Sequence, residues 1–258
     1  MRTKPLIADR SRDMDEKSWW DFWNTSYRIK DDNDAISGEL FARTSAVINE
    51  VIQNSGGSVL EIACGTGTLS RMLAYSNYHG LDISPAAIDV ARQKSGQFPP
   101  PAGASTPTYE VADFHDWSLP AQEFDVTVCV DAISSFRDQQ LAMKKMARSL
   151  RPRGHLVLTT ISPLVYRRIR RGAGVRLESG PVCHWLSRGE LHTLISQAGF
   201  MIEHSYTIMP RGNMGFLRLI NSPRLNNALG PGIAAGLKRL KELVGLGQYR
   251  LVVARKQV

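Results

Sequence analysis

The residues best suited to bind a small molecule lie in one short segment, Glu61-Ile62-Ala63-Cys64-Gly65-Thr66-Gly67. Its two glycines carry no Cβ, so the backbone can approach a ligand closely where a strand turns into the next segment. Asp82 follows Gly65 by 17 positions and ends the next predicted strand. A carboxylate there can accept hydrogen bonds from both hydroxyls of a ribose. Together these residues predict a nucleoside-binding site.

Two further acidic residues bear on which nucleoside would bind. Glu61 lies just before the turn, where a fixed carboxylate would repel a pyrophosphate and attract the ammonium group of an aminoacyl tail. Asp113 ends the third predicted strand, where it could accept a hydrogen bond from an adenine amino group. A dinucleotide site would prefer a third glycine where this chain has Ser70. The pattern favours an adenosyl amino acid over a dinucleotide, and both readings stay open.

The elements that must position these residues alternate between strand and helix. Ser84 is the expected N-cap of a helix that begins at Pro85. A regular alternation of this kind predicts an α/β fold, with a parallel sheet and helices on both faces. We expect strands over 58–65, 78–84, 108–114, 124–132 and 154–160, and helices over 68–74, 85–94 and 137–149.

The alternation becomes irregular after residue 161. We expect a helix over 187–198, opened by a capping box of Ser187 and Glu190, and strands over 200–209 and 248–256. Two long connections, 162–186 and 211–246, are candidate insertions on the substrate side, because loops of this length are often functional. The expected organisation is an N-terminal helical lid over 1–56, a cofactor-binding core over 57–161, and a remainder of the same domain over 162–258.

Composition and charge limit the partners. The chain has a net charge of +8, yet residues 151–258 hold 17 basic and only 4 acidic residues. Such a basic half attracts anions, so an anionic acceptor and contact with a membrane surface both stay open. The three cysteines lie far apart and the six histidines show no ligand spacing, so we expect no metal site and a cytoplasmic protein. We expect no DNA partner, and the oligomeric state stays open.

The successive motifs VLEIACGTG, LDIS, VADF, FDVTVCVDA and LRPRGHLVLTT resemble those of the class I S-adenosylmethionine-dependent methyltransferases. The order and spacing match over about 57–161, and more loosely to residue 256. The resemblance implies a Rossmann-like, mostly parallel sheet of seven strands whose last strand is antiparallel and lies beside the sixth. It also implies S-adenosyl-L-methionine as cofactor, held by Glu61, Ala63, Cys64, Gly65, Thr66, Gly67, Asp82, Ile83, Ala112, Asp113, Phe114, Val130 and Asp131.

A helical stripe of aromatic residues precedes this core. Trp19, Phe22, Trp23 and Tyr27 recur at helical spacing. In relatives a helix before the first strand covers the cofactor, so we expect Trp23 and Tyr27 to contact the sulfonium, which aromatic faces attract. For Trp19 and Phe22 we instead favour anchoring of the helix on the sheet.

Methyl transfer to oxygen usually needs a base, and His184 is the preferred candidate, with Asp131 as a second. His115 and Glu178 are weaker candidates. For the acceptor we expect contacts from Ser134, Ser135, Tyr166 and His184.

Three functions remain as candidates. The first is a methyltransferase acting on an oxygen or nitrogen atom of a small molecule, an anionic one among the candidates. The second is an NAD(P)-dependent oxidoreductase, which Ser70 and Glu61 disfavour. The third is a methyltransferase directed at RNA through the basic half, which the lack of a visible RNA-binding domain disfavours.

Overall fold

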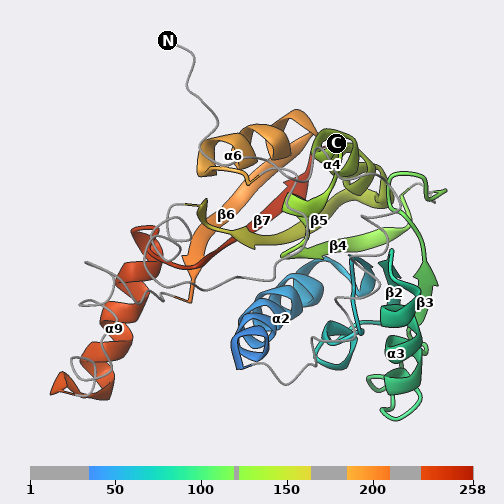
Figure 1. The fold of residues 1–258 in the computed structure, drawn as a ribbon, viewed down its shortest axis with the longest axis horizontal. Helices are drawn as coiled ribbons and strands as arrows, with labels where there is room; N and C mark the ends of the chain where they lie inside the picture. The colour runs from blue at the N-terminus through green and yellow to red at the C-terminus, as the bar shows by residue number, and fades with distance from the viewer. Residues whose placement is uncertain (1–34, 119–121, 164–184, 210–227, 258) are drawn as a thin grey trace.

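A single seven-stranded sheet organises the chain (Figure 1). The computed structural model describes residues 35–118, 122–163, 185–209 and 228–257. The strand order is β3-β2-β1-β4-β5-β7-β6, and β7 pairs antiparallel with both β5 and β6. The α/β fold with a mostly parallel sheet and an antiparallel last strand is therefore confirmed. The strands are β1 (Ser58–Ile62), β2 (Asn77–Asp82), β3 (Thr108–Val111), β4 (Phe124–Val130), β5 (Leu150–Ile161), β6 (Phe200–Ile208) and β7 (Tyr249–Lys256).

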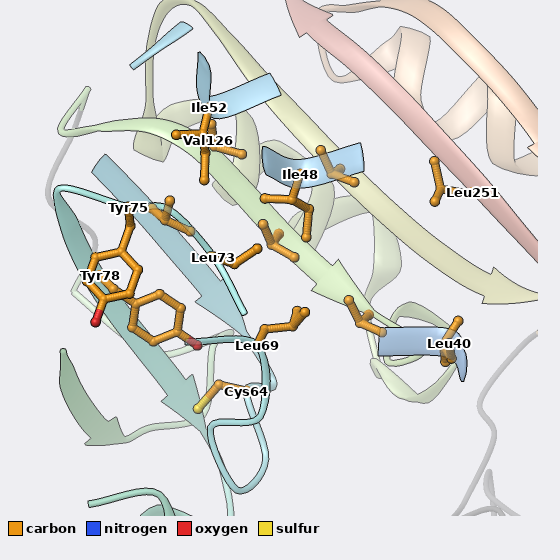
Figure 2. Close-up of a cluster of buried hydrophobic side chains, with 14 of the residues drawn as sticks. Leu40, Ile48, Ile52, Cys64, Leu69, Leu73, Tyr75, Tyr78, Val126 and Leu251 are labelled. Carbon is orange, nitrogen blue, oxygen red and sulfur yellow. The ribbon is translucent and has the colours of Figure 1, made fainter. Parts of the chain in front are cut away.

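Helices cover both faces of the sheet. On one face α2 (Ala35–Ser55) and α3 (Pro85–Ser95) contribute Ile48, Ile52 and Ile88 to a buried cluster. On the other face α4 (Gln139–Ser149) and α6 (Arg188–Gln197) contribute Met143 and Leu191 to a second cluster. Figure 2 shows the first cluster, with Tyr75 and Tyr78 at one end and Leu40 at the other. A further helix, α9 (Gly230–Leu243), follows β6 along the chain (Figure 1).

The predicted helix starts are confirmed. The Ser84 hydroxyl accepts from the Ala87 N–H at 3.3 Å, and Pro85 is the first residue of α3. The Ser187 hydroxyl accepts from the Glu190 N–H at 3.3 Å, while the Glu190 carboxylate accepts from the Ser187 N–H at 2.7 Å. These reciprocal bonds satisfy N–H groups that a helix leaves unpaired at its start.

The helix predicted over 68–74 is wrong. Only a short 3-10 helix, η1 (Leu69–Arg71), forms there. The Asn49 side chain on α2 donates to the Met72 carbonyl at 2.9 Å and accepts from the Ala74 N–H at 2.8 Å. These tertiary bonds use the backbone groups that would otherwise continue a helix.

The strand ends also differ slightly from prediction. β1 ends at Ile62 and β3 ends at Val111, so the glycine segment and Asp113 lie in turns just beyond the sheet. No helix among the described residues is long and apolar enough to cross a membrane.

Candidate cofactor site

The carboxyl ends of β1 and β4 are neighbours, and the strand order reverses between them. In open α/β sheets ligands bind at such a switch point, outside the carboxyl ends of the strands. Ala63 and Asp131 directly follow these two strands and have φ angles of +59° and +53°. Non-glycine residues with positive φ are strained, and such strain concentrates at functional sites.

Asp82 holds the turn at residues 63–67, which follows β1 and contains Gly65 and Gly67 (the glycine turn). Its Oδ2 accepts from the Gly65 N–H at 2.8 Å and its Oδ1 accepts from the Ser84 N–H at 2.9 Å. Burial raises the pKa of Asp82 to about 6, against the lowering effect of hydrogen bonds from Ser84, Gly65 and Ile83. Each carboxylate oxygen can accept more than one hydrogen bond, so the side chain can still receive a ligand hydroxyl.

Glu61 lies on the α2 side of β1 and is only 2% exposed. The Tyr78 hydroxyl donates a short hydrogen bond to its Oε2. Burial is the main cause that raises the pKa of Glu61 to about 8; the bond from Tyr78 lowers it and the charge of Asp82 raises it. Among the described residues no Lys, Arg or His forms an ion pair with Glu61. A buried carboxyl without a positive partner favours the neutral state until a cation arrives.

Small and aromatic side chains of β2, β3 and η1 pack against the glycine turn. Gly80 faces Cys64 and Tyr109, and a Cβ at Gly80 would lie 2.9 Å from atoms of both side chains. The Ser70 hydroxyl donates to the Gly67 carbonyl at 2.8 Å, so the Tyr109 hydroxyl, 2.6 Å away, donates to Ser70. Ser70, which disfavoured a dinucleotide in the sequence, therefore holds the turn in place.

Asp113 lies just past β3 and is held by basic groups. Its Oδ2 pairs with Arg137 at 2.5 Å and its Oδ1 accepts from the His115 N–H at 2.9 Å and lies 3.1 Å from the ring Nδ1. Burial raises the pKa of Asp113, but the hydrogen bonds from His115 and the charges of His115 and Arg137 lower it to about 2. The His115 Nε2 lies 3.2 Å from both the backbone nitrogen and the carbonyl oxygen of Asp138, so this ring joins the segment after β3 to the start of α4.

The segment after β4 provides the next part of the edge. The Asp131 N–H donates to the Thr159 carbonyl at 3.0 Å, which ties it to β5. Ser134 and Ser135 are buried in the 3-10 helix η2 (Ile133–Ser135). Phe114 is also buried, and its ring packs against Phe136 with centroids 6.2 Å apart.

Basic side chains gather where β7 begins. Arg250 pairs in register with Thr160 and Thr207, and it lies on the same face as Val252, in the α6-side cluster. The His192 ring on α6 hydrogen-bonds the Ser205 hydroxyl at 2.8 Å, which places Arg188, one turn earlier, level with Arg250. Burial and the charge of Arg188 lower the pKa of both Arg250 and His192. No acidic side chain in the described part of the chain forms an ion pair with Arg188 or Arg250.

The structure brings the predicted cofactor residues of β1, β2, β3 and β4 to one edge of the sheet. It does not describe Trp23, Tyr27, Tyr166, Glu178 or His184, which lie outside the described residues. The residues at that edge are Glu61, Ala63, Cys64, Gly65, Thr66, Gly67, Asp82, Ile83, Ala112, Asp113, Phe114, Val130 and Asp131.

Sequence reasoning missed Tyr78, Tyr109 and the Arg188–Arg250 pair. Strand alternation could have indicated Tyr78, because Tyr78, Gly80 and Asp82 lie on one face of β2. In the register with β1, Gly80 pairs with Glu61, so Tyr78 lies two residues away on the same face. The arginines had no such signal, because helix packing alone brings them together.

Known proteins resemble this chain in sequence and in fold. The family model described as "Methyltransferase domain" matches residues 36–205. The ubiquinone biosynthesis O-methyltransferase of Coxiella burnetii is 31% identical over 117 residues, 45% of this chain and 48% of that protein. The mitochondrial enzyme of that name from Schizosaccharomyces pombe is 28% identical over 155 residues, 59% of this chain and 54% of that protein. The chain thus spans about half the length of these relatives.

Solved structures agree on the fold. Magnesium protoporphyrin IX methyltransferase from Synechocystis, with bound S-adenosylhomocysteine, has a TM-score of 0.61 at 16% identity, covering 94% of this chain and 100% of that chain. An S-adenosylmethionine-dependent methyltransferase from Mesorhizobium loti has a TM-score of 0.56 at 22% identity, covering 87% and 99%. Because the family model matches residues 36–205, well over half of the chain, the protein belongs to the methyltransferase domain family, in the class I S-adenosylmethionine-dependent group.

Proposed function

We propose that this protein transfers the methyl group of S-adenosylmethionine to an oxygen or nitrogen atom of a small molecule. One observation carries the proposal: two buried carboxyl groups, Glu61 and Asp82, flank the glycine turn with no basic side chain paired to either in the described chain. A cationic adenosyl amino acid suits this site. A pyrophosphate would place two further negative charges beside it, which disfavours an NAD(P) cofactor.

The cofactor residues divide the ligand between them. Glu61 would receive the ammonium group, Asp82 the ribose hydroxyls, and Asp113 with Phe114 the adenine. Asp113 is already oriented by Arg137 and His115, so its carboxylate is held ionised at neutral pH. Trp23 and Tyr27 of the proposed lid, residues 1–56, would cover the sulfonium.

The bound cofactor supplies an activated methyl group: its sulfur–carbon bond breaks as the new oxygen–carbon or nitrogen–carbon bond forms, and the acceptor loses a proton. The chain's task is to hold the acceptor in line, which can contribute about 7–11 kcal/mol to lowering the barrier. Asp131, fixed by Thr159 at the end of β4, and His184 are the proposed proton acceptors. Ser134, Ser135 and Tyr166 are the proposed acceptor contacts.

We propose that the acceptor is methylated on oxygen and carries a negative charge. The relatives' printed name, ubiquinone biosynthesis O-methyltransferase, supports an oxygen nucleophile. Arg188 and Arg250 support the charge, because an anion between them would relieve their mutual repulsion. We also propose that the basic residues of 151–258 contact a membrane surface. The protein would act in the reducing cytoplasm, where free thiols such as those of buried Cys64 and Cys129 persist.

The test is methyl transfer from labelled S-adenosylmethionine to a matched pair of phenols, 3,4-dihydroxybenzoate and catechol, which differ by one carboxylate. We expect a methyl ether and S-adenosylhomocysteine in equal amounts, with a lower KM for the carboxylated phenol. Turnover of neither phenol, together with tight binding of NADH in place of S-adenosylhomocysteine, would overturn the proposal.

A further inference from the structure

The Tyr78–Glu61 pair joins β2 to β1 and is almost fully buried. Tyr78 is 3% exposed and Glu61 is 2% exposed. The Tyr78 ring packs against the rings of Tyr75 and Tyr109, with centroids 5.4 Å and 5.8 Å away. A ring packed in this way can place its hydroxyl in only a narrow range of positions. The direction of the hydrogen bond to Glu61 is therefore set by packing.

Only one of the two carboxylate oxygens of Glu61 accepts a hydrogen bond from Tyr78. Tyr78 donates to Oε2, and no other described side chain or backbone group donates to the carboxylate. Oε1 therefore keeps its capacity to accept from a ligand. Glu61 comes two residues before the glycine turn, at the carboxyl end of β1.

We propose that Tyr78 is a positioning residue, which holds Glu61 so that its free oxygen receives the ammonium group of the cofactor, and that the arriving cation displaces a proton from Glu61. This inference rests on the proposed function. The titratable groups that interact electrostatically with Glu61 are Tyr78 and Asp82 of β2, Cys64 of the turn, Tyr109 of β3 and, on the opposite face of the sheet, Cys129 of β4. All of them are neutral or negative, so none can supply the positive charge.

The first test measures protons released when S-adenosylhomocysteine binds, by calorimetry in buffers of different ionisation enthalpy. Since burial raises the pKa of Glu61 to about 8, we expect close to one proton released per ligand at about pH 7. Glu61→Gln should abolish the release. Binding without proton release in the wild-type protein would overturn the proposal.

The second test separates positioning from support of the fold. Tyr78→Phe removes only the hydroxyl, and we expect S-adenosylhomocysteine to bind about tenfold more weakly, as loss of a hydrogen bond to a charged group predicts. 5′-Methylthioadenosine has the same adenosyl part without the ammonium group, and its affinity should not change. Equal weakening of both ligands would show a merely structural role and contradict the proposal.

A pH profile and a matched control complete the design. Without the Tyr78 hydroxyl the ionised form of Glu61 is less stable, so the rise of affinity with pH should move to higher pH. Tyr75→Phe is the control, because Tyr75 belongs to the same ring cluster and its hydroxyl has no hydrogen-bond partner among the described residues. If wild-type protein binds neither ligand, the proposed function itself fails, which is a different result from loss of selectivity in Tyr78→Phe.

Discussion

The two halves of the sheet's carboxyl edge differ in charge and burial. At β1, β2 and β3 the edge carries Glu61, Asp82 and Asp113, which are all held by hydrogen bonds. Near β6 and β7 it carries Arg250 of β7 and Arg188 at the start of α6, and the adjoining α9 exposes several large apolar side chains. Those side chains are Ile233, Leu240 and Leu243 of α9 and Val244 directly after it, each more than half exposed.

This contrast teaches how one fold separates constant and variable recognition. The acidic half is built into the turn and strands that define the family, so a fixed cofactor suits it. The basic half depends on helix packing and on long connections, which can change without disturbing the sheet. We therefore expect mutations in the acidic half to affect cofactor binding, and those in the basic half to affect acceptor choice.

The largest effect is expected for Asp82→Ala. The change removes the acceptor for the Gly65 and Ser84 N–H groups, so we expect the free energy of unfolding to fall by about 3 kcal/mol and cofactor affinity to fall more than about a hundredfold. Denaturant unfolding and calorimetry measure the two. Asp89→Ala on α3 is the control, since its side chain is 77% exposed. Wild-type affinity in Asp82→Ala would remove this residue from the site.

Glu61→Gln should change how stability depends on pH. The folded pKa of about 8 exceeds the ordinary value of 4.5, so the free protein loses stability as pH rises between these values. The amide cannot ionise, so at about pH 8 we expect it to be more stable than wild type by roughly 2–4 kcal/mol, with little difference at about pH 5. Chemical denaturation of the wild type and of Glu61→Gln measures the two pH profiles. If the two profiles run parallel, the pKa of Glu61 is not raised by folding, which would contradict the prediction.

Arg250→Ala tests whether the Arg188–Arg250 end of the sheet's carboxyl edge recognises the acceptor's charge. Loss of a charge-assisted contact should raise the KM for 3,4-dihydroxybenzoate about tenfold or more, with cofactor affinity and the KM for catechol unchanged. Steady-state kinetics with both phenols measure this. Arg148→Ala, on the exposed face of α4, is the matched control. An equal rise for both phenols would show that the arginine does not read the carboxylate.

Ala63→Gly should stabilise the protein by about 0.5–1 kcal/mol, because glycine adopts the positive φ of this position without strain. Ala147→Gly within α4 should destabilise it by about 1 kcal/mol, which is the opposite sign. Thermal unfolding at equal protein concentration compares the two. A loss of stability in Ala63→Gly would mean that the turn does not hold strain.

The smallest effect is expected on α9. Leu240→Ser and Leu243→Ser should each change the free energy of unfolding by less than about 0.5 kcal/mol, because both side chains are exposed. Leu191→Ser, at a fully buried position of α6, should cost several kcal/mol, on the order of a core truncation. A large loss on α9 that depends on protein concentration would identify this surface as a contact between copies.

Most of the fold could be predicted from the sequence, because the hydrophobic periodicity and the helix-capping residues agree with the tertiary structure. Strand positions, the N-cap of α3 at Ser84 and the capping box at Ser187 all followed from local rules. The failure at 68–74 arose because Asn49 of α2, distant in sequence, takes the backbone groups of that segment.

The candidate site was predictable in its acids but not in their partners. Glu61, Asp82 and Asp113 were expected from their place at strand ends. The Tyr78 bond, the Arg137 ion pair and the Arg188–Arg250 proximity depend on register and helix packing, which one sequence does not specify.

We expect the turn after β1, with Glu61 and Asp82 beside it, to bind an adenosyl amino acid. Calorimetric titration of the purified protein with S-adenosylhomocysteine and, separately, with NADH tests it most directly. We predict saturable binding of S-adenosylhomocysteine that Asp82→Ala weakens more than about a hundredfold, and no heat from NADH. Tight NADH binding with no heat from S-adenosylhomocysteine would contradict the claim.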